Sequence, residues 1–501
     1  MLVRVRALVS GRDSWVRAAA WILPVCTAWA LFCTLRAAAF ERIRTLQVVE
    51  SYGFAVYEQL IHNAALHGEF FQTVHRGYID HWMWSGHRSL LLYVASWLYA
   101  GWPEPITLAT FQVAMVSLGC LPAFGLGKRV IGGGIGGTIG LLMYAGFPPL
   151  WVIALNDYQD LVLGVPFALA AVWALRERSV LGFVLAGFGC AMAREEWAMT
   201  LPILGIAASG GWRPRLGFAG LGVAVAGVFG AIVWFLGRDA VGYETPMNTQ
   251  IGAVVGHLPP IQRTWADFER FYVHFLRPAT FVAGLAPLTA LPAAGAFLVH
   301  LTTPNGSGID ADWRGHIHHM APVAAFLIAA AIDGFGAVGA LVWPFRGLPR
   351  WRALLEVRCA PPRWAPLALL VGLGAAFWVH DRAWVRMLRL QPTFSPILTE
   401  PTGVAPEWAL AESLPDEAVL GADQAGALLV SGFTRSFTYG ESLDEKSKIG
   451  LREFDYCFVN RKDAGIAAQA VVIGAVVVKE TRNYELYRFP KADRLPADPY
   501  R

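Results

Sequence analysis

The fold class is decided by residues 155–178, LNDYQDLVLGVPFALAAVWALRER. This stretch opens with a polar patch, continues as a long apolar run and ends in the basic cluster RER at 176–178. Lys and Arg are enriched on the cytoplasmic side of membrane helices. An apolar run with one polar and one basic boundary is therefore typical of a helix that crosses a bilayer and ends in the cytoplasm.

The composition of the whole chain also indicates that much of the protein is surrounded by lipid. Of its 501 residues, 55% are hydrophobic and only 16% are charged, which is more apolar and less charged than a soluble globular protein. The formal net charge of +4 is small, and the basic residues fall in short clusters between apolar runs. We therefore expect a membrane protein without a nucleic-acid partner.

The positive-inside rule, applied along the chain, predicts about eleven membrane spans. The N-terminus is expected in the cytoplasm because the first apolar segment follows several arginines, namely Arg4, Arg6, Arg12 and Arg17. Two large outer loops are expected at residues 40–88 and 237–276. Residues 89–102 are too short to span comfortably and are expected to be re-entrant or interfacial. Prolines are expected to break the pair of spans 277–289 and 291–303.

The transmembrane domain is expected to occupy residues 1–394, and the last span is expected to place residues 395–501 outside. That C-terminal part changes character, because strand-like stretches alternate with polar and glycine-containing turns at 417–423, 435–440, 454–460, 470–478 and 484–489. This pattern suits a small α/β or mostly β domain. The predicted architecture is an all-α polytopic membrane protein with a small extracytoplasmic α/β domain.

The first outer loop contains VVESYGFAVYEQLIHNAALHGEFF at residues 48–71. Its apolar residues form one helical stripe, whereas Glu50, Glu58 and His62 fall on other faces. Such a helix is expected to lie along the membrane surface. The glycine-rich stretch VIGGGIGGTIG at 130–140 has no strand before it, so we expect close helix packing there and no phosphate-binding loop.

Ionisable residues are costly at membrane depth, so clusters near the outer face are candidates for function. The topology brings four clusters there: Glu50 with Glu58, Asp157 with Asp160, Arg194 with Glu195 and Glu196, and His318 with His319. A carboxylate can act as general base on an acceptor hydroxyl, and Arg194 can hold a phosphate. In the plainer interpretation these charges only end helices at the water interface. Adjacent histidines diverge by about 100° on a helix, which does not suit one metal ion.

Several segments resemble, in order and spacing, a family of bacterial membrane proteins known as domain-of-unknown-function family 2079. The segments are YGFAVYEQLIHN at 52–63, GHRSLLLYVASWLYAGWPEPITLATFQ at 86–112, the stretch 155–178 and AREEWAM at 193–199. The resemblance implies the fold of C-type glycosyltransferases, which take a sugar from a polyprenyl-phosphate donor at the outer membrane face. It also implies a catalytic acid in the first outer loop.

The sequence departs from the family at that acid, because Gly53 stands where an aspartate is expected. Glu58 or Glu50 is then expected to act as the base, with Asp157 as a further catalytic acid. The family's lysine-glutamate-aspartate motif corresponds to Arg194, Glu195 and Glu196. The residues expected to contact substrate are Asp160, Arg194, Glu195, Glu196, His87, His318 and His319.

The leading hypothesis is thus an enzyme that transfers a sugar from polyprenyl phosphate to an extracytoplasmic acceptor at the bacterial plasma membrane. The expected partners are the bilayer, the lipid-linked donor and an unidentified acceptor. No cofactor is assigned, and a divalent metal ion is left open. Two alternatives are kept: a transporter or lipid-handling protein, and a non-catalytic scaffold derived from the same fold, which Gly53 favours.

Overall fold

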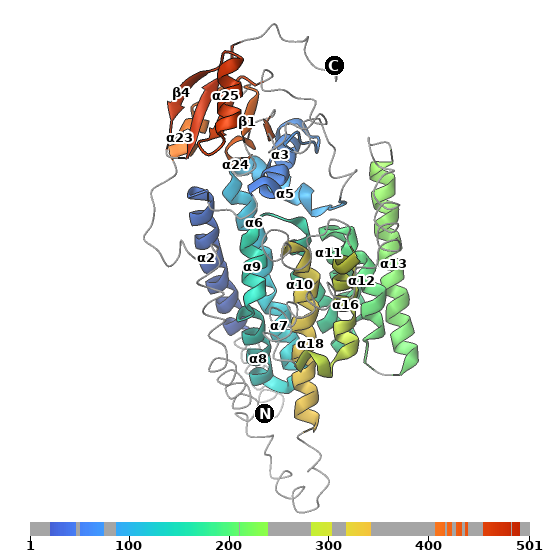
Figure 1. Ribbon diagram of the computed structural model, residues 1–501. Coiled ribbons are helices and arrows are strands. Elements are labelled where there is room, and N and C mark those ends of the chain that lie inside the picture. Colours follow the sequence, from blue (N-terminus) through green and yellow to red (C-terminus); the bar gives the residue numbers. More distant parts are fainter. Residues whose placement is uncertain are drawn as a thin grey trace, which may run out of the picture.

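The computed structural model shows a long helical part that carries a small sheet-containing domain at one end (Figure 1). It describes residues 21–46, 51–74, 87–209, 211–238, 282–302, 317–341, 406–415, 418–422, 427–432, 436–438, 454–481 and 483–490. The boundary expected at residue 394 and the second outer loop expected at 237–276 lie outside these residues, apart from the first two positions of the loop. The expected last span at 364–380 also lies outside them.

The helical part consists of helices that run back and forth along the long axis in Figure 1. Its elements are α2 (Ile22–Arg44), α3 (Ser51–His67), α5 (Leu91–Gly101), α6 (Pro105–Leu118), α7 (Cys120–Gly127), η1 (Lys128–Gly132), α8 (Gly133–Ala145), α9 (Pro148–Asn156), η2 (Asp160–Gly164), α10 (Val165–Glu177), α11 (Val180–Ala193), α12 (Glu195–Ile206), α13 (Trp212–Gly237), η4 (Val282–Leu285), α16 (Pro287–Thr302), η5 (Ile317–Met320) and α18 (Ala321–Leu341). The predicted helical class is therefore confirmed.

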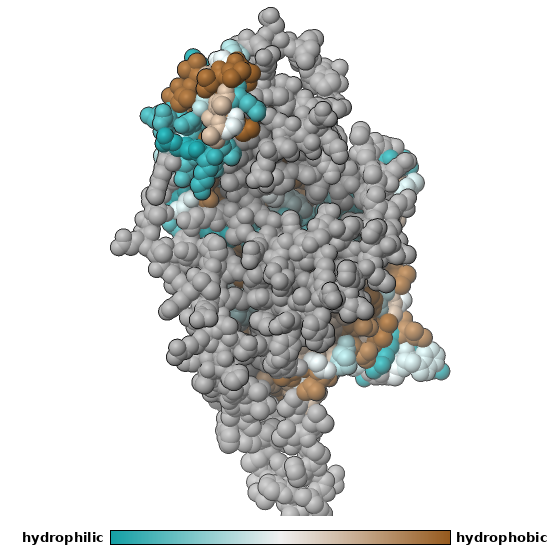
Figure 2. Space-filling view, in the orientation of Figure 1, coloured by the Kyte–Doolittle hydropathy of each residue, from teal (hydrophilic) through white to brown (hydrophobic). Residues whose placement is uncertain are grey.

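Three stretches among the described residues are long and apolar enough to cross a membrane, namely Ile22–Arg44, Pro105–Ala145 and Trp212–Gly237. The outer flank of α13 exposes large apolar side chains such as Val223, Trp234 and Phe235, and Figure 2 shows hydrophobic surface on this flank of the molecule. Exposed apolar helix faces of this kind suit lipid as the solvent. The number of about eleven spans stays a prediction.

The glycine-rich stretch at 130–140 begins in η1 and continues into α8, and its first glycines lie at the junction of the two. Gly132 and Gly133 have φ angles of 109° and 60°, which side chains with a Cβ rarely adopt. Between α7 and α8, a Cβ on Gly127 would lie 2.2 Å from the carbonyl oxygen of Gly136. The backbones of α7 and α8 therefore touch through glycines, and the expected close helix packing is confirmed.

Helix α18 forms the centre of the bundle. Every residue from Ala321 to Phe335 is buried, and the helix packs against α16, η4 and α10. The expected break between residues 289 and 291 is wrong, because α16 runs through Pro292 without interruption. The chain instead changes direction before Pro287, where the proline can begin a helix without losing a hydrogen bond.

Helix α3 is buried within the protein, and its expected position along the membrane surface stays a prediction. All side chains from Phe54 to Ile61 are buried, including the polar Glu58 and Gln59. Helix α5 covers one side of α3, and α24 (Ala427–Val430) of the C-terminal domain covers another. The apolar stripe alone could not predict this, because the second cover comes from residues far away in sequence.

The C-terminal domain is a mixed sheet with helices on both faces, which confirms the predicted small α/β domain. Its other elements are α23 (Pro406–Glu412), β1 (Leu420–Ala422), β2 (Ser436–Thr438), β3 (Tyr456–Asn460), α25 (Ala464–Val472), β4 (Val476–Glu480) and β5 (Tyr484–Arg488). The strand order is β2-β1-β3-β5-β4, with β1 parallel to both neighbours and β5 antiparallel to both of its own. Successive residues of β3 alternate faces, with Phe458 in one apolar cluster and Cys457 and Val459 in the other.

One expected strand, 470–478, is half wrong. Its first residues end helix α25, and only the part from Val476 onward forms β4. Gly474, with a φ of 86°, makes the turn between them. The run of valines is compatible with either structure, and a single glycine with a left-handed backbone separates the two.

The C-terminal domain contacts the helical part at α2 and α3. The indole nitrogen of Trp408 donates to the carbonyl oxygen of Ile43 at 3.1 Å. The hydroxyl of Ser431, directly after α24, contacts the carboxylate of Glu58 on α3. Figure 2 shows hydrophilic residues on the lower left of the C-terminal domain and a hydrophobic patch at its top. This domain therefore covers the end of the bundle at which α3 and α5 lie (Figure 1).

Candidate functional site

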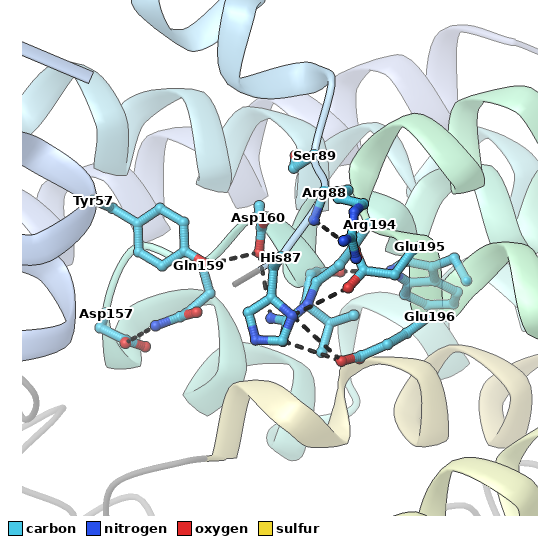
Figure 3. A network of polar contacts seen from close by, with 12 residues as sticks. Tyr57, His87, Arg88, Ser89, Asp157, Gln159, Asp160, Arg194, Glu195 and Glu196 are labelled. Carbon is cyan, nitrogen blue, oxygen red and sulfur yellow. Dashed lines mark hydrogen bonds and ion pairs between the residues drawn. The ribbon is translucent and has the colours of Figure 1, made fainter. Parts of the chain in front are cut away.

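A network of polar side chains occupies the covered end of the bundle, where several helices begin or end (Figure 3). Asp160 begins η2, directly before α10. Arg194 is an extended residue between α11 and α12, and Glu195 and Glu196 form the first turn of α12. Acidic residues are favoured there because the amino end of a helix carries partial positive charge. His87 enters from the segment that precedes α5.

Arg194 lies at the centre of this network. Its Nη1 donates to Oδ1 of Asp160 at 3.4 Å, and the side chains are 1% and 0% exposed. Its Nη2 lies 3.1 Å from Oε1 of Glu196, which is 34% exposed. The hydroxyl of Tyr57 on α3 donates to the same Asp160 oxygen at 3.0 Å. The network thus joins α3, η2 and the start of α12.

His87 connects Arg194 to the adjacent acid. Nη2 of Arg194 contacts Nε2 of His87. Because a guanidinium nitrogen can only donate, Nε2 accepts and Nδ1 carries the proton. Nδ1 donates to Oε1 of Glu195 at 3.3 Å, and the backbone N–H of Arg88 donates to the other carboxylate oxygen at 2.7 Å. Glu195 therefore fixes the orientation and tautomer of His87.

Asp157 is held by amide side chains on the same segment. Nδ2 of Asn156 donates to its Oδ1 at 3.0 Å, and Nε2 of Gln159 donates to its Oδ2 at 2.6 Å. Gln112 on α6 fixes the segment itself, because its Nε2 donates to the Asp157 carbonyl at 2.6 Å and its Oε1 accepts from the Gln159 N–H at 2.7 Å. Both oxygens of the Asp157 carboxylate are thus engaged within the protein.

The environment shifts the two acids of the network in opposite directions. Burial raises the pKa of Asp160 above its ordinary value, against the opposing charge of Arg194 and the Tyr57 hydrogen bond. Burial also acts to raise the pKa of Glu195, but the hydrogen bond from His87, the charge of Arg194 and the hydrogen bond from the Arg88 N–H outweigh it and lower that pKa to about 2. Glu195 therefore favours the ionised form, whereas Asp160 is suited to exchange a proton.

Three buried polar atoms of this region have no hydrogen-bond partner in the described part of the chain. They are Oδ2 of Asp160, Nε of Arg194 and the hydroxyl oxygen of Tyr158. Buried polar atoms without partners are rare in native proteins and need a reason. Here one acceptor and one donor belong to the same ion pair, so the pair retains bonding capacity for a bound molecule.

Glu58 does not join this network. It follows Tyr57 on α3, so its side chain points about 100° away around the helix axis. The hydroxyl of Tyr99 donates to its Oε1 at 3.1 Å, and Ser431 contacts Oε2. Burial raises the pKa of Glu58 to about 8, although the hydrogen bonds from Ser431 and Tyr99 oppose the shift. The sequence-predicted base is thus a buried group between α5 and the C-terminal domain.

The remaining expected residues are only partly described. Glu50 and the side chain of His318 lie outside the described residues. His319 is half-buried in η5, which packs against α9 and η2. His319 therefore belongs to the same end of the bundle as Asp157 and Asp160. The structure brings Asp157, Asp160, Arg194, Glu195, Glu196 and His87 together, and their roles stay a prediction.

No group of three or more His, Cys, Asp or Glu side chains among the described residues is arranged to hold a metal ion. Several possible ligand atoms of the network are already engaged, since Nε2 of His87 accepts from Arg194 and Glu195 accepts from His87 and Arg88, and Oδ2 of Asp160 alone does not make a metal site. These residues do not fit the divalent metal left open from the sequence, so no step below depends on one.

Sequence reasoning missed three contributors to the site: Tyr57, Gln112 and Trp197. Tyr57 stands next to the singled-out Glu58, and only the helical turn decides which of the two faces Asp160. The indole N–H of buried Trp197 donates to the carbonyl of Leu161 at 2.8 Å and so positions η2 on α12. An amide or aromatic residue inside an apolar run is a sign that the side chain has a buried hydrogen-bond partner. The sequence of the run does not show which residue that partner is.

The resemblance found in the sequence is confirmed. Residues 42–236 match the model of the family described as "Predicted membrane protein (DUF2079)". This range contains every residue of the polar network. A comparison with curated proteins gives no match.

The fold is similar to solved structures of another membrane protein. The crystal structure of ArnT from Cupriavidus metallidurans bound to undecaprenyl phosphate matches with a TM-score of 0.54 and 13% identity, covering 95% of this chain and 98% of that one. The apo structure of the same protein gives a TM-score of 0.51 at 13% identity, covering 93% and 99%. At this identity the likeness shows the fold alone.

Proposed function

We propose that this protein is a membrane glycosyltransferase that transfers a sugar from a polyprenyl-phosphate donor to an extracytoplasmic acceptor. The observation that carries the proposal is the buried Arg194–Asp160 pair, which retains one unpartnered donor atom and one unpartnered acceptor atom. The ArnT-like fold supports it, because one of the similar structures is that of ArnT bound to undecaprenyl phosphate. In this proposal the covered end of the bundle faces outside and the N-terminus lies in the bacterial cytoplasm.

In the proposed reaction, Arg194 binds the phosphate of the donor. Its Nε has no partner among the described residues, and its partner Glu196 is the most exposed acid of the network. The donor phosphate can therefore displace Glu196 into solvent and take its place beside the guanidinium. A bidentate contact of this kind fixes the orientation of the phosphate as well as its position.

Asp160 is the proposed general base. The acceptor hydroxyl attacks the anomeric carbon of the sugar, the bond from that carbon to the phosphate oxygen breaks, and polyprenyl phosphate leaves with the bonding electrons. Oδ2 of Asp160 takes the hydroxyl proton. Its raised pKa makes the carboxylate a stronger base than an ordinary aspartate. Displacement in one step inverts the configuration at the anomeric carbon.

Glu58 remains the competing assignment for the base. It was expected in this role because Gly53 replaces the acid that the family resemblance implies. Its carboxylate is buried against Tyr99 and Ser431, so it acts on an acceptor only if the C-terminal domain moves away from α3. Asp160 is also fully buried, so an acceptor has to open a path to either acid, but Oδ2 of Asp160 has no hydrogen-bond partner among the described residues. The two assignments separate in variants of each residue.

The function is tested by incubating the purified full chain in lipid with a panel of radiolabelled polyprenyl-phosphate sugars and a membrane extract as acceptor source. We expect label to leave at least one donor, by transfer or by slow hydrolysis. Absence of both turnover and saturable donor binding across the panel would favour the scaffold alternative, in which Gly53 reflects loss of catalysis.

A further inference from the structure

A cavity lies at the end of these helices opposite to the polar network. Its volume is about 550 Å³, and its lining includes Arg129, Arg176, Arg215, Ser209, Thr289 and Asp333. Cavities of this size hold small molecules or lipid headgroups. The lining carries three arginines against one aspartate, so the cavity attracts anions.

The position of this cavity follows from the path of the chain. The polar network lies at the start of α10 and the start of α12, whereas Arg176 lies in the last turn of α10 and Ser209 follows the end of α12. Helix α10 has 13 residues, which corresponds to about 20 Å of helix. The cavity is therefore separate from the proposed catalytic site, and the inference does not depend on the proposed function.

Arg176 builds one wall of the cavity. Its Nε donates to Oδ1 and Oδ2 of Asp333 at 3.0 and 3.1 Å, and its Nη2 donates to Oγ1 of Thr289 at 2.7 Å. Its Nη1 donates to the carbonyl oxygen of Ala207 at 2.6 Å. Asp333 is thus neutralised by the guanidinium that it contacts, and this ion pair joins α10 to α18.

The other two arginines are available to a ligand. Nε of Arg215 is buried and has no hydrogen-bond partner in the parts of the chain that the structure describes. The Arg129 side chain is 53% exposed, and its ion pair with Glu177 is long, at 3.6 Å, and open to solvent. Nε of Arg129 also donates to the carbonyl oxygen of Arg176 at 3.2 Å, and both of these contacts are made by Nε. Such surface pairs contribute little and exchange readily for another anion.

The cavity lies at the depth expected for lipid headgroups. Arg215 is in the first turn of α13, one of the helices long enough to cross a membrane. Trp212, at the start of that helix, is 67% exposed, and the guanidinium of Arg213 lies 5.6 Å from the centre of its ring. Exposed tryptophan and arginine at a helix end are typical of the membrane interface.

We infer that this cavity binds a phosphate-bearing anion through Arg215 and Arg129. The planar guanidinium groups match the geometry of phosphate oxygens, and the Arg176–Asp333 pair holds the wall against which the anion packs. The phosphate belongs either to the headgroup of an anionic phospholipid or to a soluble compound, because both present the same chemistry.

The experiment uses the full chain purified in detergent and two probes. Phosphatidylglycerol is titrated and its retention followed by native mass spectrometry, and radiolabelled inorganic phosphate is measured by equilibrium dialysis. The variants are Arg215→Gln and Arg129→Gln, with Arg215→Lys to keep the charge. Arg213→Gln is the matched control, because Arg213 is adjacent and exposed but does not line the cavity.

We expect saturable binding of at least one probe, about tenfold weaker in Arg215→Gln because one charge-assisted contact is lost. Binding should be intermediate in Arg215→Lys and unchanged in Arg213→Gln. If the protein retains phosphatidylglycerol but does not bind inorganic phosphate, the ligand is a phospholipid headgroup. If it binds inorganic phosphate, the ligand is a soluble compound. The inference is overturned if neither probe saturates, or if Arg213→Gln weakens binding as much as Arg215→Gln does. Thermal unfolding of each variant shows whether it is folded.

Discussion

Arg194 and Asp160 are 34 positions apart in the sequence and form an ion pair in which both side chains are almost completely buried. Removing two charges from water is costly unless the charges are paired and hydrogen-bonded. Each partner nevertheless retains one atom without a hydrogen bond among the described residues. The pair is thus held in place by Tyr57 and His87 and is still incomplete, which is what a binding site for an anionic donor and a hydroxyl acceptor requires.

Replacing Arg194 with lysine should weaken donor binding. Lysine keeps the charge but cannot contact Asp160, His87 and a phosphate at the same time, because it lacks the planar fork. We expect donor affinity to fall about tenfold, measured as saturable binding of a labelled polyprenyl-phosphate sugar. The control is Arg213→Lys at an exposed position. Equal affinity of Arg194→Lys and the unmodified protein would show that Arg194 does not contact the phosphate.

The burial of Glu58 should make stability depend on pH. Its pKa is raised from an ordinary 4.5 to about 8, so the folded state binds a proton that the unfolded chain has lost between these values. The stabilisation is fully present below pH 4.5 and is lost as pH rises through about 8. We expect the free energy of unfolding to fall over this range by an amount on the order of a few kcal/mol, and the apparent Tm to fall with it.

The matched variant for this prediction is Glu58→Gln. It retains the shape of the side chain but cannot ionise, so its apparent Tm should vary less with pH than that of the unmodified protein. Differential scanning fluorimetry in detergent across this range measures both proteins. Parallel profiles would mean that Glu58 is not the titrating group and that its carboxylate is solvated.

The contact between η2 and α12 should not tolerate added volume. A Cβ on Gly164 would lie 2.2 Å from Nε1 of Trp197, the atom that donates to Leu161. We expect Gly164→Ala to destabilise the protein by about 1–3 kcal/mol and to lower its apparent Tm. Gly217→Ala is the control, because a Cβ on Gly217 meets nothing within 4 Å. An unchanged Tm for Gly164→Ala would mean that Trp197 moves aside without cost.

Much of the helical part could be predicted because apolar runs and basic clusters report directly on lipid and on its boundaries. The close helix packing at the glycines of residues 130–140 follows from such a local pattern. The burial of α3 could not be predicted in this way, since it depends on α24, more than three hundred positions later in the chain. Periodicity within one helix says which face is apolar but not how many neighbours cover it.

The residues of the candidate site could be predicted from the sequence in part, but their contacts could not. Charged residues between apolar runs singled out Asp160, Arg194 and Glu195, because charges are rare at such positions without a reason. Their pairing could not be derived, nor could the choice of Tyr57 over Glu58 as the residue that α3 directs to Asp160. Contacts between buried polar atoms are decided by tertiary packing, which one sequence does not display.

The central claim is that Asp160 is the base of a sugar transfer, and turnover by Asp160→Asn tests it most directly. The full chain in lipid is supplied with the labelled polyprenyl-phosphate sugar that the unmodified protein uses, and Glu58→Gln and the exposed Glu104→Gln are measured beside it. We predict that transfer falls about a hundredfold or more in Asp160→Asn, with donor binding retained, and stays near normal in Glu104→Gln. Normal transfer by Asp160→Asn, with loss in Glu58→Gln, would contradict the claim and move the base to α3.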